Sequence, residues 1–208
     1  IRSCLVGSEM CIRDRALTKT PICDFGKKAL EFKLKSTENK ILSLKDIQGE
    51  KGTLIMFICN HCPYVKAIIN DLVKDCNEVK NFGVNSVAIC SNDVKNYPED
   101  SFEKMIEFAK ENGFSFPYLH DDTQNVAKKY GAVCTPDFFA YNNKLELQYR
   151  GRIRELKDLK PVRDGNSDLY NALKQISETG NGPQNQIPSM GCNITVSYTH
   201  LTLPTSPK

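Results

Sequence analysis

The chain has 208 residues, of which 40% are hydrophobic and 25% are charged, and its formal net charge is +3. A composition so close to the globular average excludes disordered and fibrous proteins, and the length suits one domain with a sizeable core. The longest apolar run, Leu54–Cys59, has the length of a strand and is far too short for a membrane span. We therefore expect no membrane partner.

The two ends of the chain differ in character from the middle. Residues 1–15 have no initiator Met, no hydrophobic period and no apolar core of a secretory signal, and residues 194–208 form a Thr/Ser/Pro tract. Both resemble translated adapter sequence that contaminates assembled environmental reads. We expect a non-native leader over 1–15, one domain over 16–193 and a non-native tail over 194–208, with a disordered tail at each end as the alternative.

Excluding both ends leaves nearly balanced charge, which removes the compositional support for a nucleic-acid partner. The remaining cysteines are odd in number, and their spacing indicates no disulfide scaffold. With no secretion signal visible, the sequence predicts a reducing cytoplasm. These cysteines are Cys23, Cys59, Cys62, Cys76, Cys90, Cys134 and Cys192.

In chain order, the first half predicts strands around one long helix. Residues 32–44 alternate loosely around a polar turn and indicate a hairpin. The unbroken apolar run 54–58 is typical of a strand buried on both faces. Residues 63–82 carry an apolar stripe of helical period that ends at Gly83, and residues 84–90 again indicate a strand.

The second half continues with alternating elements. An amphipathic helix over 102–109, a short helix reaching Tyr130, strands over 138–141 and 145–150, and a last helix around 169–176 are expected. This order predicts an α/β, thioredoxin-like fold, with a mixed central sheet, helices on both faces and an N-terminal β-hairpin extension.

The strand–helix junction around Cys62 carries the most informative chemistry. Pro63 suits the first position of a helix, which makes Cys62 the N-cap residue. A sulfur there faces unpaired backbone N–H groups and the positive end of the helix dipole, and both favour the nucleophilic thiolate. A protonated His61 would add to this effect.

Cys59 lies three residues before Cys62, and such a spacing can close a redox disulfide. The alternative is that Cys59 only fills the end of the strand. A closed zinc site needs four ligands, and these two cysteines with His61 supply three at most, so we expect no metal.

A second motif, Cys134-Thr135-Pro136, comes just before the strand over 138–141. It could be a simple turn, but in a thioredoxin fold this position holds a cis-proline beside the active cysteine. Cys134 would then lie near Cys62, and Cys134 and Cys90 are possible resolving cysteines. The strand-end position of Cys90 is equally consistent with burial in the core.

Three further features are given structural interpretations. Cys76 lies on the apolar stripe of its helix and is expected in the core. Cys192 follows Gly191 near the end of the domain and is expected on a mobile segment. Arg150 and Arg152 are expected on a solvated surface rather than in a docking site.

Three segments together resemble the alkyl hydroperoxide reductase / thiol-specific antioxidant family of redoxins. They are Phe57–Val65, Tyr130–Phe139 and Tyr149–Ile153, and the subgroup is the one with an Asn-His-Cys-Pro-Tyr signature. The resemblance covers about residues 18–193. It implies that Cys62 is the nucleophile, five positions after Phe57, but the second cysteine of the thioredoxin pattern is here Val65.

The resemblance implies a thiol-dependent oxidoreductase without a cofactor, in which Cys62 attacks a disulfide or peroxide and a second thiol resolves the product. Thr135 and Pro136 would shape the substrate groove, and thioredoxin or glutathione would return the electrons. Peroxiredoxins have Thr three residues before the nucleophile, where this chain has Cys59, which favours disulfide exchange. The alternatives are a non-enzymatic redox-sensing or protein-binding module and, more weakly, a zinc-binding module.

Overall fold

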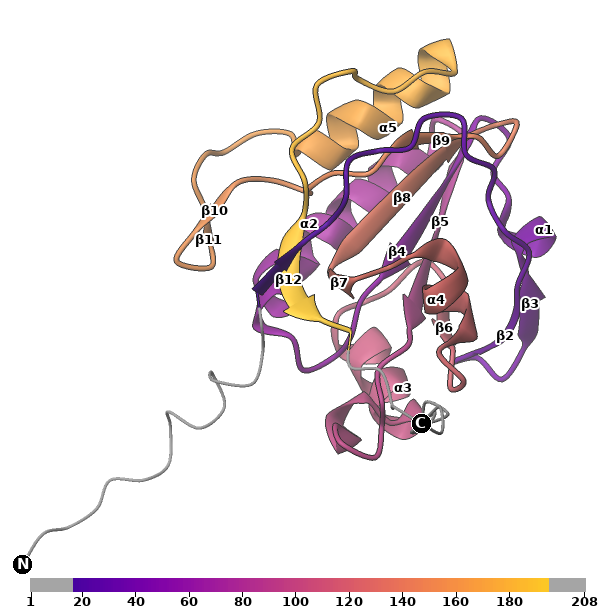
Figure 1. Cartoon of the computed structure of the whole chain (residues 1–208), viewed down its shortest axis with the longest axis vertical. Coiled ribbons are helices and arrows are strands. Elements are labelled where there is room, and N and C mark those ends of the chain that lie inside the picture. Colours follow the sequence, from indigo (N-terminus) through magenta and orange to yellow (C-terminus); the bar gives the residue numbers. More distant parts are fainter. Residues whose placement is uncertain (1–16, 195–208) are drawn as a thin grey trace, which may run out of the picture.

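The computed structural model describes residues 17–194 and shows a central seven-stranded sheet flanked by helices (Figure 1). The strands are β1 (Leu17–Lys19), β2 (Lys33–Ser36), β3 (Ile41–Ser43), β4 (Gly52–Phe57), β5 (Val84–Cys90), β6 (Tyr118–His120), β7 (Cys134–Thr135), β8 (Asp137–Asn142), β9 (Leu147–Tyr149), β10 (Leu156–Lys157), β11 (Lys160–Pro161) and β12 (Met190–Asn193). The helices are α1 (Leu44–Ile47), α2 (Pro63–Lys80), η1 (Pro98–Asp100), α3 (Phe102–Glu111), α4 (Asn125–Tyr130) and α5 (Asp168–Thr179).

The central sheet has the order β3-β2-β6-β5-β4-β8-β9 and is mixed. Strand β4 runs parallel to β5 and antiparallel to β8, and all of its residues are buried. Because side chains alternate along a strand, Leu54 and Met56 enter one core layer, whereas Ile55 and Phe57 enter the other. This two-sided burial explains why the run is continuously apolar.

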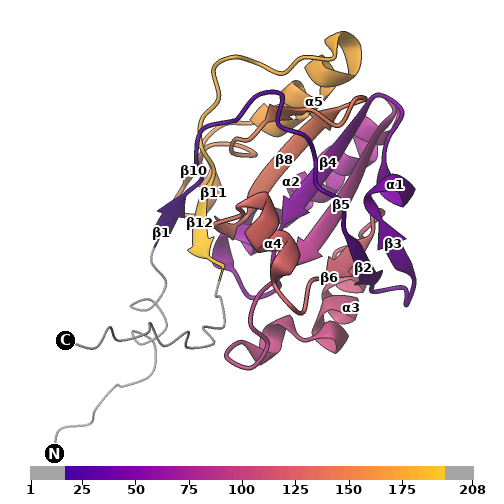
Figure 2. The same cartoon turned by 45° about the vertical axis from the view of Figure 1, so that its right-hand side comes forward.

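Helices cover both faces of this sheet, as the sequence predicts (Figures 1 and 2). Helices α2 and α5 pack on one face through residues such as Leu72 and Leu173. On the other face lie α1 and α4, where Ile47 and Tyr130 join the second core layer. Among residues 17–194, no helix combines the length and the apolarity that a membrane crossing requires.

The sheet edge near the hairpin differs from the expectation. The sequence analysis missed β6, whose three residues are too few to show a period, and β6 pairs with β2. The hairpin of β2 and β3 is therefore the edge of the central sheet rather than an appendage.

A second, three-stranded sheet joins the two ends of the described chain in the order β1-β12-β7. Cys192 lies in β12 and is 5% exposed, so its assignment to a mobile segment is wrong. Ile194, which the sequence analysis placed in the tail, is buried, and its N–H donates to the carbonyl of Val133 at 3.2 Å. All other residues of the expected leader and tail lie outside the described residues.

Arg150 also contradicts its expected place on a solvated surface. Its guanidinium is buried, pairs with Asp137 at 2.8 Å and lies 4.4 Å above the Phe139 ring. A charge-assisted pair and a cation–π contact compensate for its removal from water. Arg152 is partly buried and pairs with Asp168.

Candidate active site at the start of helix α2

Cys62 is the N-cap residue of α2, and Pro63 is the first helical residue. Proline fits there because it lacks the N–H that would have no partner in the first turn. The Cys62 thiol donates to the carbonyl of Thr135 at 3.2 Å, and its own carbonyl accepts the first helical hydrogen bond, from Lys66. The N-cap position predicted for Cys62 is confirmed.

Hydrogen-bond donors surround the Cys62 sulfur. The Cys192 side chain contributes most to holding the pKa of the Cys62 thiol well below its ordinary value, followed by the side chains of Cys59 and Thr135 and the N–H of Val65. Burial opposes this effect because it disfavours the charged form, but the donors outweigh it. The site therefore favours a thiolate at Cys62.

Cys59 has the opposite character, although it belongs to the same cluster. It is fully buried at the end of β4, and its sulfur lies 3.3 Å from the Thr135 hydroxyl. Burial, and then the hydrogen bond with Cys62, raise the pKa of the Cys59 thiol well above its usual value. Cys59 therefore stays protonated and can donate to the Cys62 sulfur.

Asp100, which the sequence analysis missed, organises the loop that carries His61. The Asp100 carboxylate accepts from the N–H of Asn60 at 2.8 Å and from the side chain of Asn92 at 2.8 Å, and it lies 2.6 Å from His61 Nδ1. The His61 ring also stacks on Tyr97, with 4.7 Å between centroids. These contacts fix the orientation of the His61 ring.

Among residues 17–194, Cys59, His61 and Asp100 form the group that could hold a metal ion, because their ligand atoms lie within 4.8 Å of one another. They supply three ligands, one fewer than a closed zinc site requires. Hydrogen-bond donors of the loop already engage both carboxylate oxygens of Asp100. The cluster is therefore satisfied as a hydrogen-bond network.

Thr135 and Pro136 form the wall opposite Cys62. The peptide bond between them is cis, as the thioredoxin-like fold predicts. Strand β7 pairs antiparallel with β12, with Cys192 directly opposite Thr135. Gly191 makes this approach possible, because a Cβ at this position would lie 2.0 Å from the Thr135 carbonyl oxygen.

The two cysteines proposed as resolving residues are both buried. Cys134 precedes Thr135 in β7, and its thiol donates to the carbonyl of Pro136 at 3.7 Å. Cys90 ends β5 and has no exposed surface. Burial raises the pKa of both thiols, that of Cys90 to about 12. The sequence analysis gave Cys192 no place in the site, whereas the structure pairs it with Thr135.

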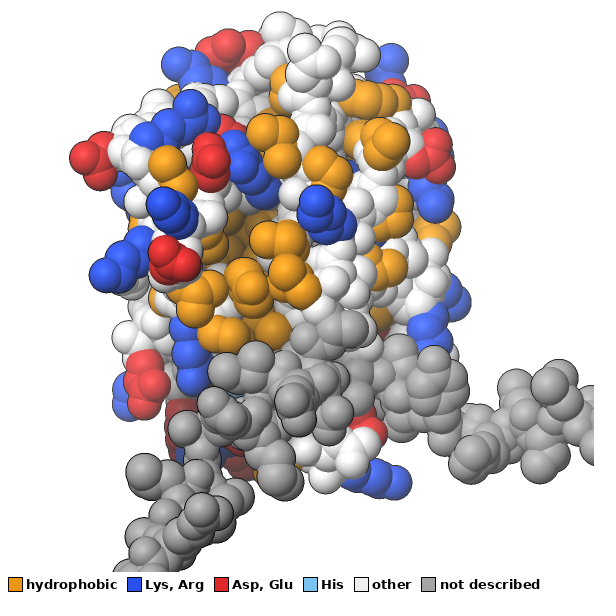
Figure 3. All heavy atoms as spheres, turned by 60° about the vertical axis from the view of Figure 1, so that its left-hand side comes forward, with side chains coloured by type: hydrophobic (Ala, Val, Ile, Leu, Met, Phe, Trp, Pro, Cys, Tyr) orange, Lys and Arg blue, Asp and Glu red, His pale blue; other side chains and the backbone are white. Residues whose placement is uncertain are grey.

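A groove of about 470 Å³ opens beside this cluster, on the face where hydrophobic side chains gather around a hollow (Figure 3). Tyr64 and Pro136 line its end next to the cysteines, and Leu159, Ile187 and Met190 lie along its other walls. Its size and apolar lining are typical of a ligand site. Cys62 itself has no exposed surface in this conformation.

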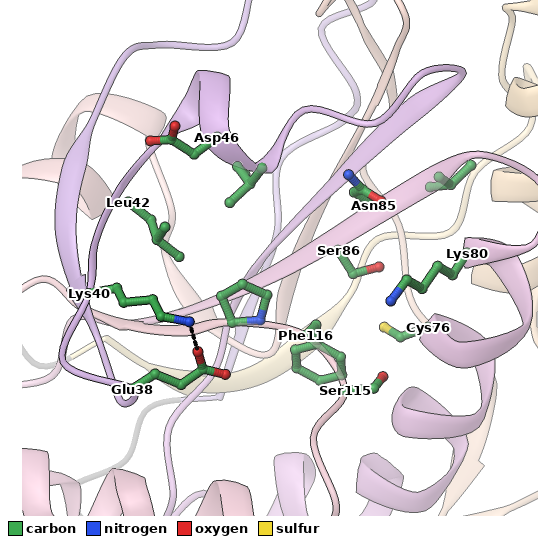
Figure 4. A pocket seen from close by; sticks show the side chains of 13 residues that line it. Glu38, Lys40, Leu42, Asp46, Cys76, Lys80, Asn85, Ser86, Ser115 and Phe116 are labelled. Atoms are coloured by element: carbon green, nitrogen blue, oxygen red, sulfur yellow. Dashed lines mark hydrogen bonds and ion pairs between the residues drawn. The ribbon is translucent and has the colours of Figure 1, made fainter.

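A second cavity, of about 370 Å³, lies between the hairpin edge of the sheet and the second half of α2 (Figure 4). There the Cys76 and Ser86 side chains point toward one another, and an ion pair joins Glu38 and Lys40 nearby. Burial raises the pKa of the Cys76 thiol to about 12, so this cavity contains an unreactive sulfur.

The fold and the thiol cluster together define a thiol redox protein of the thioredoxin-like class. Residues 25–156 match the AhpC/TSA family, and the chain belongs to that family. A search of curated protein sequences finds no match.

Among solved structures, an uncharacterized conserved protein from Geobacillus kaustophilus is 38% identical, with a TM-score of 0.82, covering 92% of this chain and 98% of that one. A hypothetical protein from Sinorhizobium meliloti 1021 is 33% identical, with a TM-score of 0.80 and coverage of 87% and 100%. The thioredoxin domain of a thiol-disulfide oxidoreductase from Bacteroides vulgatus is 17% identical, with a TM-score of 0.57 and coverage of 74% and 97%, and shows the shared fold.

Proposed function

We propose that this protein is a thiol–disulfide oxidoreductase in which Cys62 is the nucleophile. The observation that carries the proposal is the setting of the Cys62 sulfur, at the N-terminus of a long helix and among several hydrogen-bond donors. Such a setting stabilises the thiolate, which is the form that attacks a disulfide. The family match supports a thiol-dependent redox function.

The first step is an exchange at sulfur. The Cys62 thiolate attacks one sulfur of a substrate disulfide, a new S–S bond forms to Cys62, and the other substrate sulfur leaves as a thiolate that takes up a proton. A second thiol then attacks the Cys62 sulfur of the mixed disulfide and releases the substrate half that was bonded to it. An external thiol donor, such as thioredoxin or glutathione, reduces the disulfide that results.

The groove beside Tyr64 and Pro136 is the proposed place for the substrate. Its apolar walls suit the side chains or organic groups that flank a disulfide. Thr135 lies against both sulfurs of the cluster, since its hydroxyl is 3.3 Å from the Cys59 sulfur and its carbonyl oxygen is 3.2 Å from the Cys62 sulfur. We assign to His61 the role of holding the loop before α2 through Asp100.

Peroxide reduction by the same thiolate is the second candidate, and the AhpC/TSA family match favours it. A peroxidase gains from a cation that stabilises the leaving alkoxide. The arginines of the nearby segment are instead held by carboxylates, since Arg150 pairs with Asp137, and Arg154 pairs with Asp71. This difference favours disulfide exchange.

The test uses the fully reduced protein with one equivalent of oxidised glutathione or of hydrogen peroxide, followed by alkylation and mapping of every cysteine by mass spectrometry. We expect Cys62 to react first and faster with the disulfide, and Cys62→Ser to lose the reaction. Cys23→Ser, which changes a buried cysteine outside the thiol cluster, is the matched control.

Two outcomes would contradict this function. If Cys62 stays reduced while other cysteines oxidise at random, Cys62 is not the nucleophile. If Cys62 reacts once but neither thioredoxin nor glutathione, each with its reductase, supports repeated turnover, the protein is a redox-sensing module rather than an enzyme.

A further inference from the structure

The proposed reaction needs a second thiol, and the structure brings one from the far end of the chain. Strand β12 runs beside β7 near the start of α2 (Figures 1 and 2). In this pairing Cys192 is opposite Thr135, the residue whose carbonyl lies 3.2 Å from the Cys62 sulfur. Cys62 and Cys192 belong to the same buried cluster.

The close fit of β12 depends on Gly191. Any larger residue would put its Cβ against the Thr135 carbonyl and hold the strand away from β7. The neighbouring positions of β12 therefore lie close to the wall of the active site. Cys192 keeps 5% of its surface exposed, whereas Cys62 and Cys59 have none.

The other nearby thiols are engaged elsewhere or carry less reactive sulfurs. Cys59 donates to the Cys62 sulfur, but it is fully buried, and burial raises the pKa of its thiol well above the usual value. Cys134 donates to the carbonyl of Pro136. Cys90 lies at the end of β5 with no exposed surface. The hydrogen bond from Cys192 is the largest influence that lowers the pKa of Cys62, which agrees with close contact between the two sulfurs.

We infer that Cys192 is the resolving cysteine, and that it closes a disulfide with Cys62 between β12 and the start of α2. The inference rests on the proposed function, because it requires Cys62 to form a mixed disulfide first. The Cys192 thiol gives up its proton and attacks the Cys62 sulfur, and the substrate half leaves as a thiolate that takes up a proton. Overall, two protein thiols and one substrate disulfide give one protein disulfide and two substrate thiols.

The experiment follows the second step in the full-length chain. Reduced protein receives one equivalent of oxidised glutathione, is quenched by alkylation at intervals, and is mapped by peptide mass spectrometry. In the unaltered protein and in Cys59→Ser we expect a Cys62–Cys192 disulfide. In Cys192→Ser we expect Cys62 to remain glutathionylated, because the thiol that resolves the mixed disulfide is missing.

Thermal unfolding gives an independent readout, because a disulfide stabilises more when it closes a longer loop. A bond from Cys62 to Cys192 encloses most of the domain, so the oxidised protein should melt at a clearly higher temperature than the reduced one. A bond from Cys62 to Cys59 closes a very short loop and should change the melting temperature little.

The outcomes separate this inference from the proposed function. If Cys62 pairs with Cys59 or any other cysteine, or if Cys192→Ser resolves as fast as the unaltered protein, Cys192 is not the resolving thiol, although Cys62 remains the nucleophile. If Cys62 forms no mixed disulfide even in Cys192→Ser, the proposed function fails as well.

Discussion

Helix α2 carries two buried cysteines with opposite chemistry. Cys62 caps its N-terminus beside Thr135, and its thiol pKa is lowered, whereas Cys76 lies on the buried stripe of the same helix, and its thiol pKa is raised to about 12. Both have little exposed surface. The comparison shows that burial alone does not decide the reactivity of a thiol, because unpaired N–H groups and side-chain donors can outweigh desolvation.

The largest expected effect is a difference in alkylation rate between these two sulfurs. At neutral pH, iodoacetamide should modify Cys62 roughly 10³-fold faster than Cys76, because the thiolate is the reactive form and Cys76 stays protonated. Timed alkylation with peptide mass spectrometry measures both rates in one sample. Cys62→Ser should remove the fast site and leave the rate at Cys76 unchanged. Equal alkylation rates at the two sulfurs would show that Cys62 is no more reactive than Cys76.

The next effect is the pH dependence of stability. Because the pKa of Cys62 is lower in the folded state than its unfolded value of about 8.5, its contribution to stability is complete above that value and is lost as the pH falls. Between pH 8 and pH 6 the free energy of unfolding contributed by Cys62 should fall by about 1.4 kcal/mol per pH unit.

The contribution of Cys76 to stability changes with pH in the opposite direction, since the pKa of its thiol is raised. Its contribution is complete below the unfolded pKa of about 8.5 and is lost as the pH rises toward 12. Urea unfolding of the unaltered protein, Cys62→Ser and Cys76→Ser at pH 6, 7 and 8 tests the sign for Cys62 and the absence of a pH dependence for Cys76 in this range. The difference between the unaltered protein and Cys62→Ser should grow with pH, and that for Cys76→Ser should stay flat. Two flat differences would show that Cys62 is not a thiolate.

A smaller effect is expected from Thr135→Val, which keeps the shape of the side chain but removes its hydroxyl. A hydrogen bond to a charged group contributes about 1.5–3 kcal/mol, so the pKa of Cys62 should rise by about one unit or more. The thiolate absorbance near 240 nm, titrated against Cys62→Ser, measures this shift. An unchanged titration would mean that the remaining donors hold the thiolate without Thr135.

The smallest effect is expected at the other cysteine of α2. Ser86→Ala removes the hydroxyl that faces Cys76 in the second cavity, which should raise the pKa of Cys76 further. The exchange activity should stay within about twofold of the unaltered protein, and the stability should change by less than about 1 kcal/mol. A large loss of activity would show that the second cavity is coupled to Cys62.

The sequence predicts the parts of this site that depend on local patterns. The passage from an apolar strand into a helix that begins at Pro63 identifies Cys62 as a cap, because both signals lie within a few residues of it. The cis bond before Pro136 follows from the thioredoxin-like fold. The central sheet is predicted except for β6, whose three residues carry no readable period.

The missed parts depend on contacts between distant segments. Cys192 reaches Thr135 only through pairing of β12 with β7, and a short strand containing Gly191 has no periodic signal of its own. Asp100 meets His61 across a loop, and its sequence neighbours only suggest a turn. Buried Arg150 is a similar case, since it follows β9 whereas its partner Asp137 begins β8.

The sheet formed by β1, β12 and β7 joins segments that are synthesised at very different times. β12 is among the last described segments to leave the ribosome, whereas α2 and β7 emerge much earlier. During synthesis Cys62 is therefore present before β12 is available to pair with β7. Pairing of β12 with β7 completes the site, so the reactive sulfur acquires its final environment only after this late segment has been made.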